Sequence, residues 1–331
     1  MNNNDSKPKR IFLTGASGCI GHYVAEALIQ QTNHELYFLV RDANKLKFDY
    51  QARDGINILN ADLHDIDKFK TLLQTIDCAV LIATAWGGVQ AYDINVVKTL
   101  RLMNLLDSNV CEQVIYFSTA SILDQNNKLL KEAGQIGTDY IRTKYDCKRQ
   151  LSRQAIYPKV TTVYPTLVLG GDANKPYSHL TSGLPEVVKW LNLIRFFKAD
   201  ASFHFIHARD IAQVVLFLIE NPSDKLEPRD IVLGNQSLTV NQAVAEACEY
   251  FNKNIPFRIP LSVELAEILI NLLRLFGVKI ELAAWDEFCM KYRHFTYQNP
   301  VNPSTFGLNT YCPNFKNIFQ VSGIPATEKN V

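Results

Sequence analysis

The chain has 331 residues, of which 47% are hydrophobic and 20% are charged, a composition typical of a globular protein that buries a sizeable core. A formal net charge of +1 provides no overall field that would favour nucleic acid or an anionic membrane, so neither is expected as a partner. No run reaches the roughly 18 apolar residues that a membrane-spanning helix needs. The first ten residues lack the apolar stretch of a signal peptide, which predicts a cytoplasmic protein.

The seven cysteines are scattered through the sequence. They form no C-x-x-C pair and have no Cys/His spacing that is typical of a zinc site. We therefore expect reduced, mostly buried thiols and no metal.

In chain order, residues 1–8 are polar and expected to be disordered, and short apolar runs then alternate with helical patterns. The runs are almost continuously apolar, as parallel strands are when helices cover both faces of a sheet. The repeated strand–helix order predicts a doubly wound, Rossmann-type α/β fold, with its ligand beyond the carboxyl ends of the strands. The expected strands cover residues 10–14, 36–40, 56–59, 78–83, 114–117 and 160–164, and helices are expected after each of the first five except the second.

The pattern changes after the sixth expected strand. Residues 170–185 are rich in Gly, Pro, Ser and Asn and are expected to form a loop, while 203–206 and 230–233 are expected to be late strands around a helix. We expect residues 9–170 to form a nucleotide-binding domain, to which 203–235 return. Residues 171–202 and 236–331 are expected to form a smaller, mostly C-terminal substrate-binding lobe.

Residues 261–276 have the pattern of an amphipathic helix with a broad apolar face. Its polar stripe is not basic, so packing over the lobe is favoured over peripheral membrane contact or a lid over an apolar substrate.

The segment Thr14-Gly15-Ala16-Ser17-Gly18-Cys19-Ile20-Gly21 follows the first expected strand and opens a helix. Gly15 is expected to make a tight turn, Gly18 to let the backbone approach a pyrophosphate, and Gly21 to allow close helix–strand packing. The helix N-terminus then offers free N–H groups to phosphates. This context predicts a dinucleotide site rather than an ordinary glycine turn.

Arg41 lies twenty residues after Gly21, where the residue that reads the ribose is expected. A carboxylate there suits the 2′-hydroxyl of NAD, whereas a guanidinium suits the 2′-phosphate of NADP. The position predicts NADP over NAD. Asp42 would serve NAD after a shift of one residue, and a solvated surface arginine is the remaining alternative.

Tyr140 and Lys144 are four residues apart, on one face of the helix that follows the fifth expected strand. A lysine ammonium about 4 Å from a phenol, at an effective dielectric of about 20, is worth roughly 4 kcal/mol, or about three pKa units. This would bring the pKa of the Tyr140 phenol close to neutral pH, where the phenol becomes an effective general acid/base.

Three hydroxyls, of Ser118, Thr119 and Ser121, close the fifth expected strand. A hydroxyl at this carboxyl end is expected either to bond a substrate oxygen or to satisfy the local backbone.

With these motifs in order, residues 9–233 resemble the extended short-chain dehydrogenase/reductase family, also described as NAD-dependent epimerases/dehydratases. The resemblance implies a Tyr140–Lys144 catalytic pair, with Thr119 as the catalytic hydroxyl, and Lys144 bonded to the nicotinamide ribose. It also implies dimerisation through residues 96–106 and 140–154. The further cofactor contacts it implies, besides Arg41 and the three glycines, are Ser17, Cys19, Ile20, Asp62, Leu63, Ala83, Thr84, Ala85, Asn95, Tyr164 and Pro165.

The sequence departs from the family pattern at Leu123, where many members carry a tyrosine, and at Tyr164, where arginine is common. The last hundred residues match no substrate-specific pattern and show no set of basic residues for a diphosphate. The expected activity is therefore NADP-dependent reduction of a carbonyl, or oxidation of an alcohol, on a small, fairly apolar molecule. A nucleotide-sugar epimerase or dehydratase that retains NAD, and a non-catalytic NADP-binding sensor, are the alternatives.

Overall fold

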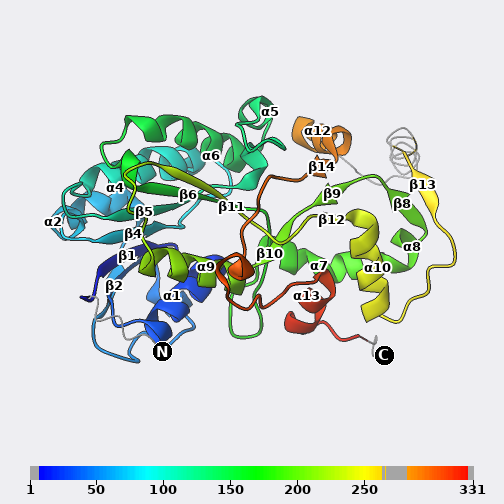
Figure 1. Ribbon diagram of the computed structural model, residues 1–331, viewed down its shortest axis with the longest axis horizontal. Helices are drawn as coiled ribbons and strands as arrows, with labels where there is room; N and C mark the ends of the chain where they lie inside the picture. The colour runs from blue at the N-terminus through cyan, green and yellow to red at the C-terminus, as the bar shows by residue number, and fades with distance from the viewer. Residues whose placement is uncertain (1–6, 263–264, 266–281, 327–331) are drawn as a thin grey trace.

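The computed structural model describes residues 7–262, 265 and 282–326. Its main sheet has seven parallel strands in the order β11-β6-β5-β4-β1-β2-β3, which confirms the predicted doubly wound Rossmann-type fold (Figure 1). The strands are β1 Arg10–Thr14, β2 Glu35–Val40, β3 Ile56–Asn60, β4 Cys78–Leu81, β5 Gln113–Phe117, β6 Val160–Pro165 and β11 Arg229–Leu233.

Helices cover both faces of this sheet, which explains why its central strands are almost continuously apolar. On one face, α1 (Cys19–Gln31) packs along α9 (Ala208–Glu220), and their apolar residues share one core with β1 and β2. The opposite face carries a second core. The elements on or beside that face are η2 (Leu63–Phe69), α2 (Lys70–Leu73), α3 (Gln90–Tyr92), η3 (Asp93–Lys98), α4 (Thr99–Leu105), α5 (Lys131–Gln135), α6 (Asp139–Gln150) and η5 (Leu151–Arg153).

The strand order reverses between β1 and β4. Strand β1 pairs with β2 on one side and with β4 on the other, so the chain leaves β1 and β4 towards opposite faces of the sheet. Such a switch point opens a crevice at the carboxyl ends of the two strands. The glycine segment after β1 and the residues after β4 therefore lie at one edge of the sheet.

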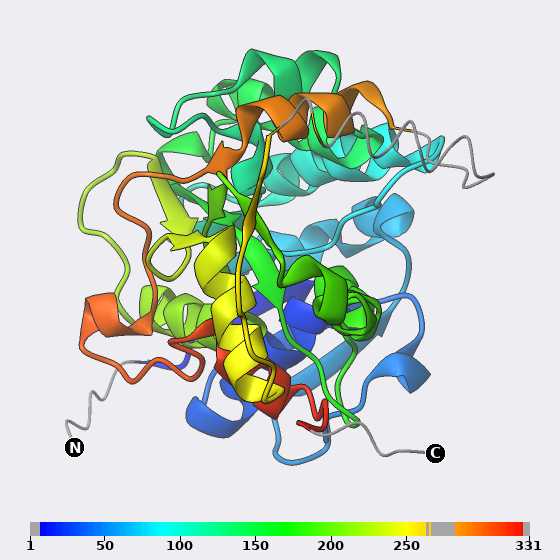
Figure 2. The same cartoon turned by 90° about the vertical axis from the view of Figure 1, so that its right-hand side faces the viewer.

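A smaller lobe lies beside this edge (Figure 1) and faces the viewer in Figure 2. Its helices surround an apolar core of its own, and three short sheets, β10-β7, β12-β9-β14 and β13-β8, connect its segments. Its elements are β7 Leu167–Leu169, α7 His179–Lys189, α8 Leu191–Ile194, β8 Phe197–Ala199, β9 Ser202–Phe203, β10 Phe205–His207, β12 Leu238–Thr239, α10 Val240–Tyr250, β13 Ile259–Leu261, α12 Ala284–Tyr292, β14 His294–Phe295 and α13 Phe315–Val321. The short helix η7 (Pro303–Phe306) instead returns to the main sheet, where Phe306 stacks on Phe217 of α9.

Two local expectations need correction. Residues 170–185 are not all loop, because α7 begins at His179, where the Ser178 hydroxyl accepts the N–H of Thr181, and the helix continues through Pro185. Burial of Leu184 in the lobe core offsets the cost of a proline inside a helix. The expected strand 203–206 is interrupted at His204, so β9 and β10 belong to two different small sheets.

Three further expectations concern the cysteines, membrane-spanning helices and the helix expected over residues 261–276. All seven cysteines are free thiols, and five of them are buried. In the described residues no helix is long and apolar enough to cross a membrane. The amphipathic helix expected over 261–276 lies almost wholly outside the described residues.

Candidate active site

A cavity of about 950 Å³ occupies the switch-point crevice, and we call it the sheet-edge cavity. Its walls come from the carboxyl ends of β1, β2, β4, β5 and β6, from α6, and from the first turn of α7. It therefore extends from the main sheet to the lobe. Of the residues expected at the site, those that line it are Gly15, Ser17, Gly18, Cys19, Ile20, Gly21, Arg41, Asp62, Leu63, Ala83, Thr84, Ala85, Thr119, Tyr140, Lys144 and Pro165.

The glycine segment makes a turn that side chains would block. Gly15 has a φ of 82°, and a Cβ at Gly21 would lie 2.0 Å from the Gly15 carbonyl oxygen. Helix α1 begins directly after Gly18, without a side-chain cap and without an acidic residue in its first turn. The positive end of the helix therefore faces the cavity without an internal counter-charge, so these residues fit a dinucleotide pyrophosphate.

The residues after β2 differ in where their side chains lie. Arg41 and Lys45 line the cavity, whereas the Asp42 carboxylate caps the short helix η1 (Ala43–Lys45) by accepting the N–H of Asn44 at 3.0 Å. The Arg41 guanidinium, 77% exposed, lies 3.9 Å from the Asp62 carboxylate. At this end the cavity thus has two cations and one carboxylate, which also bonds the His64 ring.

Thr119, Tyr140 and Lys144 meet at the carboxyl end of β5. The Lys144 ammonium donates to the Phe117 carbonyl at 2.8 Å and lies 6.0 Å from the centre of the Tyr140 ring. Burial raises the pKa of Tyr140 to about 12, against the smaller lowering effect of a hydrogen bond with Thr119, and burial lowers the pKa of Lys144 to about 8. Burial thus shifts the Tyr140 pKa in the direction opposite to the one expected from Lys144, and the lowering of this pKa by Lys144 stays a prediction.

Asn95 does not line the cavity but supports its wall. Its side chain is fully buried in η3, a π-helical turn, where its oxygen accepts from Thr84 and from the Ala85 N–H at 2.9 and 2.8 Å. Its amide donates to the Ala85 carbonyl and to Thr143 on α6 at 2.7 and 2.9 Å. One side chain thus joins the segment after β4 to the helix that carries Tyr140 and Lys144.

Tyr164 also lies away from the cavity. Its ring, on β6, is buried, and its hydroxyl donates to the Asp230 carboxylate at 3.2 Å. The cavity lining at this point is formed by Pro165, Thr166 and Leu167 instead. Of the remaining hydroxyls after β5, Ser118 and Ser121 both line the cavity.

Sequence reasoning did not identify Trp86 and His179. The Trp86 ring lies 4.4 Å from the Tyr140 ring, at 31° between planes, and 4.3 Å from the His179 ring, edge on. Trp86 follows β4, whereas His179 opens α7, in a stretch expected to be loop. Only the position of Trp86 directly after Ala83, Thr84 and Ala85 could have indicated it.

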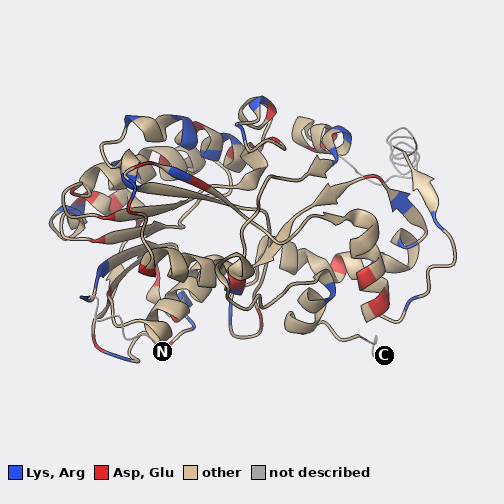
Figure 3. Ribbon diagram, viewed as in Figure 1, with Lys and Arg blue, Asp and Glu red and all other residues tan. Residues whose placement is uncertain are grey.

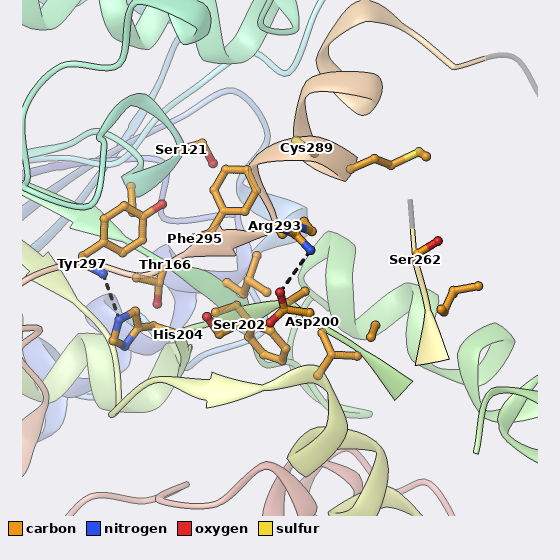
Figure 4. A pocket seen from close by; sticks show the side chains of 18 residues that line it. Ser121, Thr166, Asp200, Ser202, His204, Ser262, Cys289, Arg293, Phe295 and Tyr297 are labelled. Atoms are coloured by element: carbon orange, nitrogen blue, oxygen red, sulfur yellow. Dashed lines mark hydrogen bonds and ion pairs between the residues drawn. The ribbon is translucent and has the colours of Figure 1, made fainter. Parts of the chain in front are cut away.

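A second cavity, of about 400 Å³, adjoins the first, and we call it the lobe cavity (Figure 4). Ser121, Thr166 and Leu167 line both cavities. The Thr119 hydroxyl donates to Ser121 Oγ at 3.3 Å, so the hydroxyls at the end of β5 lie where the two cavities meet. A molecule that contacts Thr119 and Tyr140 has space for its remaining atoms in the lobe cavity.

The comparisons with known proteins agree with this architecture. The crystal structure of gox2253 is 18% identical, with a TM-score of 0.64, covering 96% of this chain and 94% of that chain. The dTDP-glucose 4,6-dehydratase from Bacillus anthracis, in complex with NAD, is 13% identical, with a TM-score of 0.62 and 95% of each chain covered. A UDP-N-acetylglucosamine 4-epimerase from Methanobrevibacter ruminantium, in complex with UDP-N-acetylmuramic acid, is 18% identical, with a TM-score of 0.56, covering 77% of this chain and 86% of that chain. At these identities the likeness shows the fold.

A search of curated proteins finds no significant sequence match. The family model of the NAD dependent epimerase/dehydratase family matches residues 11–234, which is more than half of the chain. This match confirms the expected class of enzyme, the extended short-chain dehydrogenases/reductases. The chain belongs to the NAD dependent epimerase/dehydratase family.

Proposed function

We propose that this protein is an NADP-dependent oxidoreductase that reduces a carbonyl group, or oxidises an alcohol, on a small and fairly apolar substrate. The observation that carries the proposal is the meeting of Thr119, Tyr140 and Lys144 where the sheet-edge cavity opens into the lobe cavity. A substrate oxygen at this junction can contact both hydroxyls while its carbon skeleton occupies the lobe cavity.

The cofactor supplies or accepts the hydride when it is bound. The Thr119 hydroxyl, already bonded to Ser121, orients the substrate oxygen towards the phenol. Tyr140, which holds its proton at neutral pH, donates it to the oxygen as negative charge develops there during reduction. The Lys144 ammonium, anchored on the Phe117 carbonyl and near the Tyr140 ring, stabilises the phenolate that remains.

Arg41 and Lys45 support the choice of NADP. Both line the sheet-edge cavity after β2, and their cationic groups suit a 2′-phosphate. Asp42, the alternative reader of an NAD ribose, is occupied as a helix cap and does not line the cavity.

The second candidate is a nucleotide-sugar epimerase or dehydratase that retains NAD. Relatives of this fold with those printed activities are in complex with NAD or a nucleotide sugar, and the Asp62 carboxylate lines the cavity beside Arg41. Against it, the described lining of the lobe cavity offers a single guanidinium for a diphosphate, and that group is paired with Asp200.

Fluorescence titration of the purified protein with NADPH and NADH tests the proposal, after a check for co-purified nucleotide. We expect an empty protein that binds NADPH at least tenfold more tightly than NADH, followed by NADPH consumption with members of a panel of neutral ketones and aldehydes. NAD that dialysis does not remove would favour the second candidate, and tenfold tighter binding of NADH would contradict the choice of NADP.

A further inference from the structure

The walls of the lobe cavity are mainly apolar. Aromatic rings of Phe203, Phe295 and Tyr297 line it, and strands β9, β12 and β14 beside it carry no Lys, Arg, Asp or Glu (Figure 3). A substrate body in this cavity therefore contacts hydrocarbon over most of its surface.

The histidines near these walls already have hydrogen-bond partners. Ser202 Oγ and His294 Nδ1 are 2.8 Å apart, and one ring nitrogen of His204 bonds the Asn235 carbonyl at 2.7 Å. The other ring nitrogen of His204 accepts the Tyr297 N–H at 3.1 Å (Figure 4). These hydrogen bonds stabilise the lobe. Recognition of a charged substrate therefore depends on the two charged side chains in the lining, Arg293 and Asp200.

Those two side chains are Arg293 and Asp200, the only charged residues in the described lining of the lobe cavity. Arg293 Nη1 lies 3.1 Å from Asp200 Oδ2 (Figure 4). Arg293 ends α12 with a φ of 58°, and its carbonyl accepts the Ser202 N–H at 3.2 Å, which fixes the backbone against β9. The Arg293 and Asp200 side chains are 42% and 74% exposed, so the pair places one positive and one negative charge at the solvent-exposed side of the apolar wall. His294 Nε2 lies a further 3.7 Å from the other oxygen of the Asp200 carboxylate.

We propose that Asp200 determines which substrates the lobe cavity accepts. Because its carboxylate compensates the charge of Arg293, the cavity is selective for uncharged substrates and excludes nucleoside diphosphates. A diphosphate brings at least two negative charges, which need unpaired cations for compensation. Here it would meet a guanidinium that already serves a carboxylate, together with the repulsion of that carboxylate. This inference rests on the proposed function, because it assumes that the substrate extends from Thr119 and Tyr140 into the lobe cavity.

The test is calorimetric titration with UDP of protein saturated with NADP⁺, at pH 8 and an ionic strength of about 20 mM, where screening is weak. Saturation blocks the phosphate site at α1, so that UDP reports on the lobe cavity. We expect the wild type to bind UDP with a Kd above about 1 mM and Asp200→Asn to bind at least tenfold more tightly, because the substitution frees Arg293 and removes the repulsion. The gain should shrink as salt is added.

Two controls separate charge from other effects. The double variant Asp200→Asn/Arg293→Gln should lose the gain, and uridine, which is uncharged, should bind equally to the wild type and Asp200→Asn. Equal thermal unfolding temperatures would show that both variants are folded.

Micromolar binding of UDP by the wild type, or no gain in folded Asp200→Asn, would overturn the inference. The NADP⁺ titration that precedes these measurements tests the proposed function separately. If NADP⁺ does not bind, the proposed function fails by itself. UDP titrations of the wild type, Asp200→Asn, Arg293→Gln and the double variant then still report whether the charge pair controls anion binding, because the phosphate site at α1 is open to the same extent in all four proteins.

Discussion

The indole ring of Trp86 lies against the phenol ring of Tyr140, with ring centres 4.4 Å apart and planes inclined by 31°. The contact joins the segment after β4 to the helix that carries the proposed proton donor. On its other side, the Trp86 ring contacts the edge of the His179 ring at the start of α7 in the lobe. An aromatic pair of this kind is worth about 0.5–1.5 kcal/mol beyond the area it buries. The orientation of the Tyr140 ring therefore depends on a residue from a different part of the sheet edge.

Replacing Trp86 tests this dependence. Trp86→Ala should lower kcat about three- to tenfold with a ketone that the NADPH screen identifies, because the Tyr140 phenol loses the indole ring that fixes its orientation. Trp86→Phe, which keeps an aromatic face, should restore most of the rate. NADPH affinity should change little in either variant, and equal kcat values for the two variants would contradict a positioning role.

Tyr140→Phe removes the proposed proton donor and leaves its ring in place. Turnover should fall at least a hundredfold, a loss typical for a missing general acid, while NADPH binds with nearly unchanged affinity. Steady-state kinetics and fluorescence titration measure the two quantities. Retained activity in this variant would refute the role given to Tyr140.

Arg41→Ala tests the cofactor choice. The loss of charge-assisted hydrogen bonds to a 2′-phosphate should weaken NADPH binding about ten- to a hundredfold and leave NADH binding unchanged. The matched control is Asp42→Asn, because an amide oxygen can still cap η1 and hold Lys45 in place while the carboxylate is removed, so neither affinity should change. Equal losses for NADPH and NADH in Arg41→Ala would show that this guanidinium does not read the 2′-phosphate.

Buried Lys144 makes stability depend on pH. Burial lowers its pKa to about 8 from an ordinary value of 10.5, so between these values the unfolded chain holds a proton that the folded protein has lost. Stability therefore rises with pH across this window. Relative to Lys144→Met, the wild type should gain on the order of 1–2 kcal/mol between about pH 7.5 and about pH 9.5 in urea unfolding. Parallel pH curves for the two proteins would contradict the burial of a titrating lysine.

The glycine turn offers a pair of matched substitutions. Gly21→Ala should destabilise the protein by about 3 kcal/mol or more, because its Cβ would lie 2.0 Å from a backbone oxygen that side-chain motion cannot relieve. Gly18→Ala, whose Cβ would lie 3.5 Å from the same oxygen, should change the free energy of unfolding by less than about 1 kcal/mol. Denaturant unfolding of both variants measures the difference, and similar losses would contradict the turn geometry.

Local patterns in the sequence were sufficient for the main sheet. The strands expected at 10–14, 36–40 and 114–117 occur within a residue or so of those bounds, because a strand buried on both faces must be apolar throughout. The strand expected at 56–59 also occurs, as the half-buried edge strand β3. The glycine segment and the tyrosine–lysine spacing are equally local, since a turn and a helix face depend only on nearby residues. These features, with the order of strands and helices, determined the fold class and brought most of the expected site residues to one cavity.

Features that depend on burial or on contacts between distant segments could not be predicted from local patterns. Burial, which no spacing rule measures, holds the proton on Tyr140, and the capping role of Asp42 follows from the direction in which its side chain leaves β2. Helix α7 forms through Pro185 because the lobe core stabilises it. The Arg293–Asp200 pair joins residues 93 positions apart in the chain. Local patterns therefore predicted a Rossmann fold with a glycine segment suited to a dinucleotide, whereas no local pattern could indicate that these two charges meet at the lobe cavity.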